Sequence, residues 1–255
     1  MKYFGGKLDH GIYYDGNSFW GPIAQHHVIF GWLLEDDLDM QLREEQGWAG
    51  VISLPRVLKI ISGHKRKKLH HWADVAGFTP FPESWGQWEM ELSFAVSGDA
   101  TRLGFDVVHS HCKLSIITLK IYVGIGLEAE RTRVFFEPTS ESIIVDRSQS
   151  STISGIRNCQ KHAPHTLFKF ARLDKDHPSV EEVELEVLTF HILYDRSVLQ
   201  IFVVNERTAL TTRVYPDSGT SNGVRVFIDK EHYVSSDSVM SQTLSCDLWP
   251  LSPPS

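Results

Sequence analysis

Carboxylates that could do acid–base chemistry gather near the start of the chain. They are Asp9, Glu35, Asp36, Asp37 and Asp39. Two carboxyl groups that face each other across a substrate can serve as a proton donor and as a nucleophile or base. Four of the five, however, fall in one short run directly after Trp32, and a run of like charges usually forms a solvated loop. We therefore interpret this acidic run as a solvated loop rather than a catalytic pair.

Three other motifs could bind a ligand, and each has a simpler interpretation. The segment His109–Cys112 (HSHC) offers metal-binding side chains, but a strand would divide them between two faces and no second cluster accompanies them, which favours a surface turn. The basic run Lys65–Lys68 is typical of an exposed linker in an acidic chain. Gly124 and Gly126 lack the third glycine and the helix of a nucleotide-binding motif. No serine-centred nucleophile elbow is present.

The composition is that of an ordinary globular protein, with 255 residues, 42% of them hydrophobic and 22% charged. A formal net charge of −7 argues against general binding of nucleic acid and is compatible with a neutral, sugar-like ligand. The apolar runs are too short to span a membrane, so we expect a soluble protein. The cysteines, Cys112, Cys159 and Cys246, are too few for a disulfide framework or a zinc motif.

The first residues, MKYFGGKLDHGIYYDG, contain no apolar segment of the kind found in signal peptides. Two interpretations follow. Either the protein stays inside the cell, or the sequence does not begin at the start of a secreted precursor.

The most regular pattern lies in Leu188–Pro216, where three apolar runs are separated by short polar breaks. The runs are Leu188–Tyr194, Val198–Val204 and Thr208–Tyr215. This pattern predicts a meander of three antiparallel strands. In the middle run Leu199, Ile201 and Val203 share one face and Phe202 lies on the other, so both faces are largely apolar. Such a strand is typical of a two-layer sandwich.

Strand candidates divide the chain into two β units. Residues 1–62 hold about four strands, roughly one blade of a β-propeller, which cannot bury both of its faces alone. Those candidates are Ile12–Tyr14, Asn17–Trp20, His27–Trp32 and Val51–Ile61. We predict a linker at 63–83, an antiparallel β-sandwich of the concanavalin or lectin type at 84–250, and a frayed tail at 251–255. The predicted fold class is thus all-β, a sandwich preceded by a remnant of a propeller blade.

The meander resembles a known family. The pattern Asp-Arg-Ser-Val-x-x-x-Phe runs from Asp195 to Phe202, and Asn-x-Arg-Thr-x-x-Thr-x-Arg-Val-Tyr-Pro runs from Asn205 to Pro216. Together they resemble the last strands of the C-terminal sandwich of glycoside hydrolase family 32, which contains invertases, inulinases, levanases and fructosyltransferases. The family usually has Glu where this chain has Gln200, a loss of charge that we place at the sandwich surface.

The first unit resembles the fifth and last blade of the catalytic propeller of that family. The matching segments are Asp9–Gly11 with Tyr14, Phe30–Trp32 with Glu35, and Gln46–Gly50 with Ser53–Arg56. The resemblance implies that Asp9, Tyr14 and Trp32 lie at a sugar site, where an aromatic face suits the apolar face of a sugar. The alternative is that all three simply pack the blade. Asp15 stands where the family has Ala, which bears on the local shape of the pocket.

The resemblance implies hydrolysis of β-fructofuranosidic bonds in sucrose or fructans, without a cofactor or metal, by two carboxyl groups roughly 5 Å apart. In the family the nucleophile lies in Asn-Asp-Pro-Asn-Gly, a transition-state stabiliser in Arg-Asp-Pro, and the acid/base in Glu-Cys. This sequence contains no Asp-Pro, and its cysteines follow His111, Asn158 and Ser245. We assign no catalytic residue and predict a C-terminal fragment or degenerate copy, inactive alone, that spans about half of a family enzyme.

Two alternatives belong to other functional classes. The chain could be a non-catalytic module, with the sandwich binding fructan or serving as a scaffold. A separate chain could also supply the missing half of the propeller and pack on residues 1–62.

Overall fold

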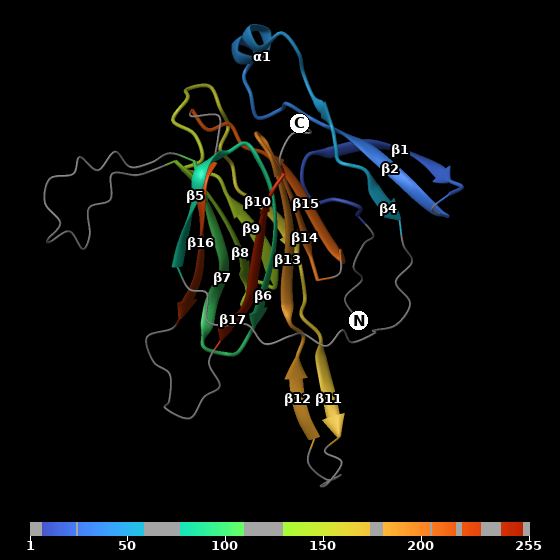
Figure 1. Ribbon diagram of the computed structural model, residues 1–255, viewed down its shortest axis with the longest axis vertical. Coiled ribbons are helices and arrows are strands. Elements are labelled where there is room, and N and C mark those ends of the chain that lie inside the picture. Colours follow the sequence, from blue (N-terminus) through green and yellow to red (C-terminus); the bar gives the residue numbers. More distant parts are fainter. Residues whose placement is uncertain are drawn as a thin grey trace, which may run out of the picture.

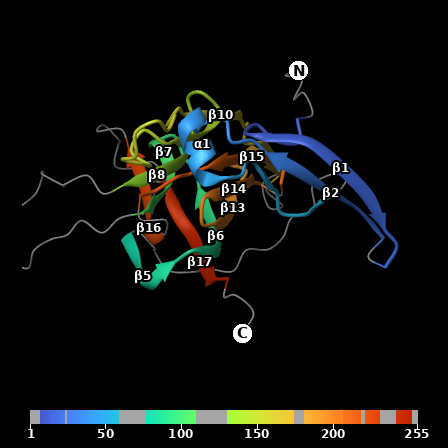
Figure 2. The ribbon, with the colours of Figure 1, turned by 90° about the horizontal axis from the view of Figure 1, so that it is seen from above.

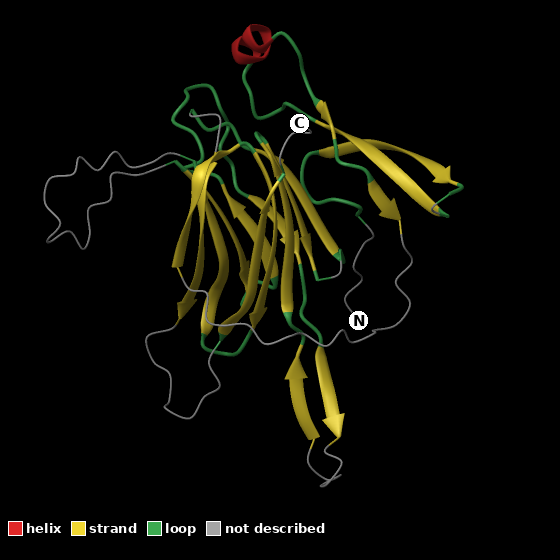
Figure 3. Cartoon of the chain, viewed as in Figure 1, coloured by secondary structure: helices red, strands yellow, loops and turns green. Residues whose placement is uncertain are grey.

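The computed structural model describes residues 7–23, 25–58, 77–109, 130–173, 181–204, 206–217, 221–230 and 241–251. Within these ranges nearly every regular element is a β-strand (Figure 3). The expected all-β class is therefore confirmed. None of the helices in the described ranges is long and apolar enough to cross a bilayer. The predictions for Lys65–Lys68, His111, Cys112, Gly124 and Gly126 and for most of the tail lie outside the described residues.

Two antiparallel sheets form the sandwich (Figure 1). The six-stranded sheet has the order β10 (Lys161–Pro164), β9 (Ser142–Asp146), β8 (Arg131–Glu137), β7 (Ala100–Val108), β16 (Ser221–Lys230) and β5 (Gly77–Trp85). The five-stranded sheet has the order β15 (Thr208–Arg213), β14 (Val198–Val203), β13 (Leu188–Asp195), β6 (Gln87–Ala95) and β17 (Gln242–Pro250). A separate hairpin is formed by β11 (Lys169–Leu173) and β12 (Glu181–Leu185). The predicted meander is confirmed as β13, β14 and β15.

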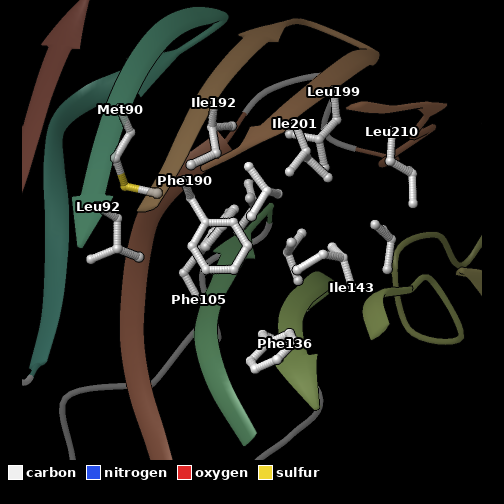
Figure 4. Packing of buried hydrophobic residues seen from close by; sticks show 14 of the residues in the cluster. Met90, Leu92, Phe105, Phe136, Ile143, Phe190, Ile192, Leu199, Ile201 and Leu210 are labelled. Atoms are coloured by element: carbon white, nitrogen blue, oxygen red, sulfur yellow. The ribbon is translucent and has the colours of Figure 1, made fainter. Parts of the chain in front are cut away.

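The core lies between the two sheets, where apolar side chains from both converge (Figure 4). Along β14, Leu199 and Ile201 are fully buried in this core, as the alternation of the sequence predicts. Phe190 from β13 contacts the rings of Phe94 and Phe105 edge-to-face, with centroids 6.2 and 6.0 Å away. These contacts join the inner faces of β13 and β7 and stabilise the sandwich mainly by burying apolar surface.

The blade is a four-stranded sheet made of β1 (Tyr13–Gly21), β2 (His26–Leu33), β3 (Val51–Ile52) and β4 (Arg56–Leu58). Strands β3 and β4 both pair with β2. The two strand candidates expected at 12–14 and 17–20 form one strand with a register shift, because Asp15 has a positive φ of 46°. Figure 2 shows β1 and β2 extending away from the sandwich beside β14 and β15.

Helix α1 (Met40–Gln46) follows β2 and was not expected from the sequence. Asp39 caps its first turn by accepting a hydrogen bond from the backbone N–H of Leu42 at 2.8 Å. Gly47 ends it in the left-handed conformation, with φ 76°. A helix this short has too few residues for a visible periodicity, so only its caps could have indicated it.

The six-stranded sheet begins earlier than the predicted sandwich boundary. Strand β5 starts at Gly77, inside the range expected to be a linker, and pairs with β16 at the sheet edge. The proline-rich stretch that suggested a linker is tolerated here because an edge strand leaves one side of its backbone unpaired.

Candidate functional site

Two of the three predicted sugar-site residues lie side by side on the blade. Tyr14 on β1 pairs with Trp32 on β2, and Trp32 pairs with Ile52 on β3. Directly paired residues project from the same face of a sheet, so these three side chains form one row. All three are exposed. The row continues along the same face with Phe19, which stacks on Phe30 with a centroid distance of 5.9 Å.

The Trp32 indole lies against the backbone of Gly50. A Cβ at Gly50 would come within 2.3 Å of the indole Nε1, and Gly50 has a positive φ of 80°. Glycine at this position thus permits both the turn and the close approach of the ring.

Asp9 lies elsewhere, at the junction between the blade and the sandwich. Its Oδ1 accepts hydrogen bonds from the backbone N–H groups of Gly11 and Thr211 at 2.7 and 3.0 Å. Its Oδ2 accepts from Arg56 at 2.9 Å and from the Thr211 hydroxyl at 2.7 Å. The side chain is only 1% exposed. These contacts tie Asp9 to β15, and a contact between Asp9 and sugar stays a prediction.

Arg56 connects Asp9 to the outer face of the five-stranded sheet. Its guanidinium lies 4.4 Å from the ring centroid of Tyr13 and 5.0 Å from that of Phe202. It also donates a hydrogen bond to Oε1 of Gln200 at 3.1 Å. Gln200 is 1% exposed, so the expectation that it lies at the surface was wrong. The blade covers this part of the sheet, which sequence alternation could not reveal.

The expectation that the acidic run is a solvated loop was wrong for Glu35. This residue is 3% exposed, and its two carboxylate oxygens accept hydrogen bonds from Arg213 and Tyr215. Arg213 also donates to the hydroxyl of Ser197 at 2.8 Å. Burial raises the pKa of the Tyr215 phenol well above its ordinary value, and the bond to Glu35 acts in the same direction. Tyr215 is therefore a hydrogen-bond donor to Glu35 throughout the neutral pH range.

The same expectation was wrong for Asp37, which is 7% exposed. Its carboxylate accepts a hydrogen bond from Arg147 at 2.8 Å and lies 3.5 Å from the Lys161 ammonium. Asp36 and Asp39, by contrast, are exposed as expected. The acidic run thus alternates between residues that enter the sandwich and residues that face solvent.

The expectation that the segment His109–Cys112 is a surface turn was wrong for its first residue. His109 is fully buried, and its Nε2 lies 2.8 Å from the hydroxyl of Thr132. Burial lowers its pKa to about 3. Across the described ranges, no three His, Cys, Asp or Glu side chains are grouped in a way that could hold a metal ion.

Comparison of the sequence with models of known protein families identifies the family of the chain. A sequence model described as "Glycosyl hydrolases family 32 C terminal" matches residues 59–247, which is most of the chain. A second model, "Glycosyl hydrolases family 32 N-terminal domain", matches residues 4–73. The chain belongs to glycoside hydrolase family 32.

Plant β-fructofuranosidases match most of this chain. Acid beta-fructofuranosidase of Vicia faba is 24% identical over 245 residues, covering 87% of this chain and 38% of that protein. Beta-fructofuranosidase 1 of Zea mays is 24% identical over 247 residues, covering 87% and 36%. The chain spans about two-fifths of the length of these relatives.

Solved structures of family 32 proteins share the fold. Fructan 1-exohydrolase IIa from Cichorium intybus aligns with a TM-score of 0.61 at 18% identity, covering 95% of this chain and 48% of that one. The β-fructofuranosidase from Schwanniomyces occidentalis complexed with fructosyl-erythritol aligns with a TM-score of 0.59 at 13% identity, covering 95% and 48%.

The sequence analysis did not identify the arginines at the junction between the blade and the sandwich. The motifs that suggested the family include Arg56, Arg213 and Tyr215. Their positions in the sequence did not show which side chains they contact in the fold. The partner of Arg147 could not be identified from the sequence, because Asp37 lies 110 positions away. The buried arginines could be found only once the fold had brought them to the acidic run.

Proposed function

We propose that this chain forms the C-terminal part of a β-fructofuranosidase-type glycoside hydrolase, as a fragment or a degenerate copy, and is inactive alone. The observation that carries this is the sequence: last-blade motifs are present, while Asp-Pro and Glu-Cys are absent throughout. The junction supports it, because the buried carboxylates of the blade are each bonded to an arginine. Two carboxyl groups that share a substrate need oxygens free to reach it.

In this proposal residues 1–62 are the last blade and 84–250 the supporting sandwich. Tyr14 and Trp32 contribute an aromatic wall to a sugar site completed by the other blades, and Asp9 sets the position of the strand that bears Tyr14. The partner of the exposed blade face is the missing half of the propeller, on a longer form of this chain or on another chain. The apolar row on that face, together with coverage of only 48% of the similar structures, supports this partner.

The purified chain is expected to release no detectable fructose from sucrose or inulin. The reaction requires a nucleophile and an acid/base that the sequence does not supply. Fructose is measured enzymatically over long incubations at pH 4 to 7, beside a full-length family 32 β-fructofuranosidase as positive control. Turnover at a rate comparable to that control would contradict the proposal.

A second candidate function, a non-catalytic fructan-binding module, is favoured by the exposed pair Tyr14 and Trp32. We expect any saturable binding of inulin or levan, measured by calorimetry, to weaken roughly 10-fold or more in Trp32→Ala, since an exposed aromatic platform contributes on the order of 1–2 kcal/mol to a stacked ligand. Trp249→Ala is the matched control, because both indoles are 45% exposed and Trp249 lies on the sandwich. Equal weakening in both variants, or equal binding of an unrelated glucan, would argue against a fructan site on the blade.

A further inference from the structure

The sandwich holds Arg147 in place with its own backbone. The guanidinium donates to the carbonyl oxygens of Cys159 at 3.0 Å, Arg157 at 3.3 Å and Arg213 at 2.9 Å. The residue is 1% exposed. All three carbonyl groups belong to the sandwich, so the position of this cation does not depend on the blade.

Arg213 lies beside it and is held by side chains. Its guanidinium donates to the Ser197 hydroxyl at 2.8 Å and lies over the rings of Tyr215 and Trp48, 5.1 and 5.6 Å from their centroids. The bond from Arg147 to the Arg213 carbonyl connects the two residues. Among the residues that the structure describes, the carboxylates bonded to this pair, Glu35 and Asp37, both come from the blade segment. Two buried positive charges therefore have their counter-charges on a different structural unit.

Glu35 and Asp37, two residues apart, each bond one of the two arginines. Residues Glu35–Leu38 form a turn, closed by a hydrogen bond from the Leu38 N–H to the Glu35 carbonyl at 3.2 Å. The turn buries the side chains of Glu35 and Asp37 against the sandwich and leaves Asp36 between them exposed.

Backbone contacts continue this pairing just beyond the acids. Arg157 donates its backbone N–H to the Asp37 carbonyl at 2.7 Å, and Asp39 donates to the Gly155 carbonyl at 3.1 Å. Leu38 and Ile156 form an antiparallel β-bridge between these two bonds. Residues 37–39 thus pair with the loop 155–157, directly beside the turn whose carboxylates bond the two arginines.

We propose that Arg147 and Arg213 form a socket on the sandwich for an acidic turn whose two carboxylates are two residues apart. Glu35-Asp36-Asp37 occupies it and docks the blade. The blade is then held on the sandwich without the rest of a propeller and without the covalent connection through residues 59–76. This docking does not depend on whether the chain is part of an active hydrolase.

The test uses the full chain with a specific protease site introduced between Leu58 and Gly77. After cleavage, size-exclusion chromatography under native conditions is expected to show the two pieces eluting together. Asp37→Asn is expected to weaken their association roughly 100-fold or more, because it leaves buried Arg147 without its counter-charge. Asp36→Asn makes the same chemical change one residue away, on an exposed side chain, and is expected to leave the association unchanged.

Hydrogen exchange on the uncleaved chain separates release of the blade from loss of the whole fold. Asp37→Asn is expected to speed exchange in β1 and β2 while β13 and β14 stay protected. The proposal is overturned if the cleaved wild-type pieces separate at micromolar concentration, if Asp36→Asn and Asp37→Asn behave alike, or if exchange rises equally in blade and core.

Discussion

Replacing Gly11 with alanine is expected to lower the free energy of unfolding by roughly 3 kcal/mol or more, through overpacking and lost hydrogen bonds. A Cβ at this position would lie 1.7 Å from the carbonyl oxygen of Thr211, a backbone atom that cannot rotate away. The flanking residues His10 and Ile12 donate their N–H groups to the Ala209 and Thr211 carbonyls at 2.9 and 3.0 Å. Moving the segment away from β15 would therefore break both bonds and disturb Asp9.

Urea denaturation followed by tryptophan fluorescence measures this loss. The matched control is Gly21→Ala in the blade hairpin, where the new Cβ would meet only the His26 carbonyl at an ordinary 3.5 Å. We expect the control to change stability by about 0.5 kcal/mol or less. Similar denaturation midpoints for the two variants would contradict the close approach of Gly11 to β15.

Acidification is expected to destabilise the chain strongly between pH 6.5 and about 4. Burial lowers the pKa of His109 to about 3 and that of His165 to about 4, with the Arg207 cation adding to the effect at His165. The unfolded chain takes up both protons near pH 6.5, whereas the folded chain does so only near the lowered values. Uptake of each proton therefore favours unfolding as the pH falls. Together the two histidines lower the free energy of unfolding by roughly 3–5 kcal/mol by pH 4.5.

The free energy of unfolding measured at pH 7.5, 6, 5 and 4.5 tests this effect, because ordinary carboxylates titrate mostly below that window. In His165→Asn the pH dependence is expected to fall by about half, since asparagine can keep a hydrogen bond to Thr208 but does not titrate. His162→Asn, at an exposed position on β10 three residues before His165, is the control and should keep the full dependence. An unchanged slope in His165→Asn would show that this residue is not buried in its neutral form.

The sandwich could be predicted because the sequence patterns that indicate its strands involve only residues close together in the chain. The period-two pattern of Leu199 and Ile201, and the short breaks around β14, require only neighbouring residues to be recognised. The junction could not be predicted, because Glu35 pairs with Arg213 across 178 positions and the charge-run rule considers only sequence neighbours. Family motifs indicated Asp9 and Trp32 together, yet the fold places one at the junction and the other on the open face.

The helix and the linker boundary show two further limits of local patterns. Helix α1 begins with the cap provided by Asp39. In the sequence this residue was interpreted only as part of a run of acidic residues. Strand β5 contains Pro80 and Pro82, which suggest a break, although an edge strand accommodates them.

The segment His10–Ile12 has a consequence for self-association. Strand β15 is the last of its sheet, yet all six of its residues are buried. The N-terminal segment supplies hydrogen bonds along this outer margin. A version of the chain that began after Ile12 would present a row of unpaired backbone groups beside apolar side chains. Such a margin is a template for strand-to-strand aggregation, and the segment His10–Ile12 protects the chain against it by pairing with β15.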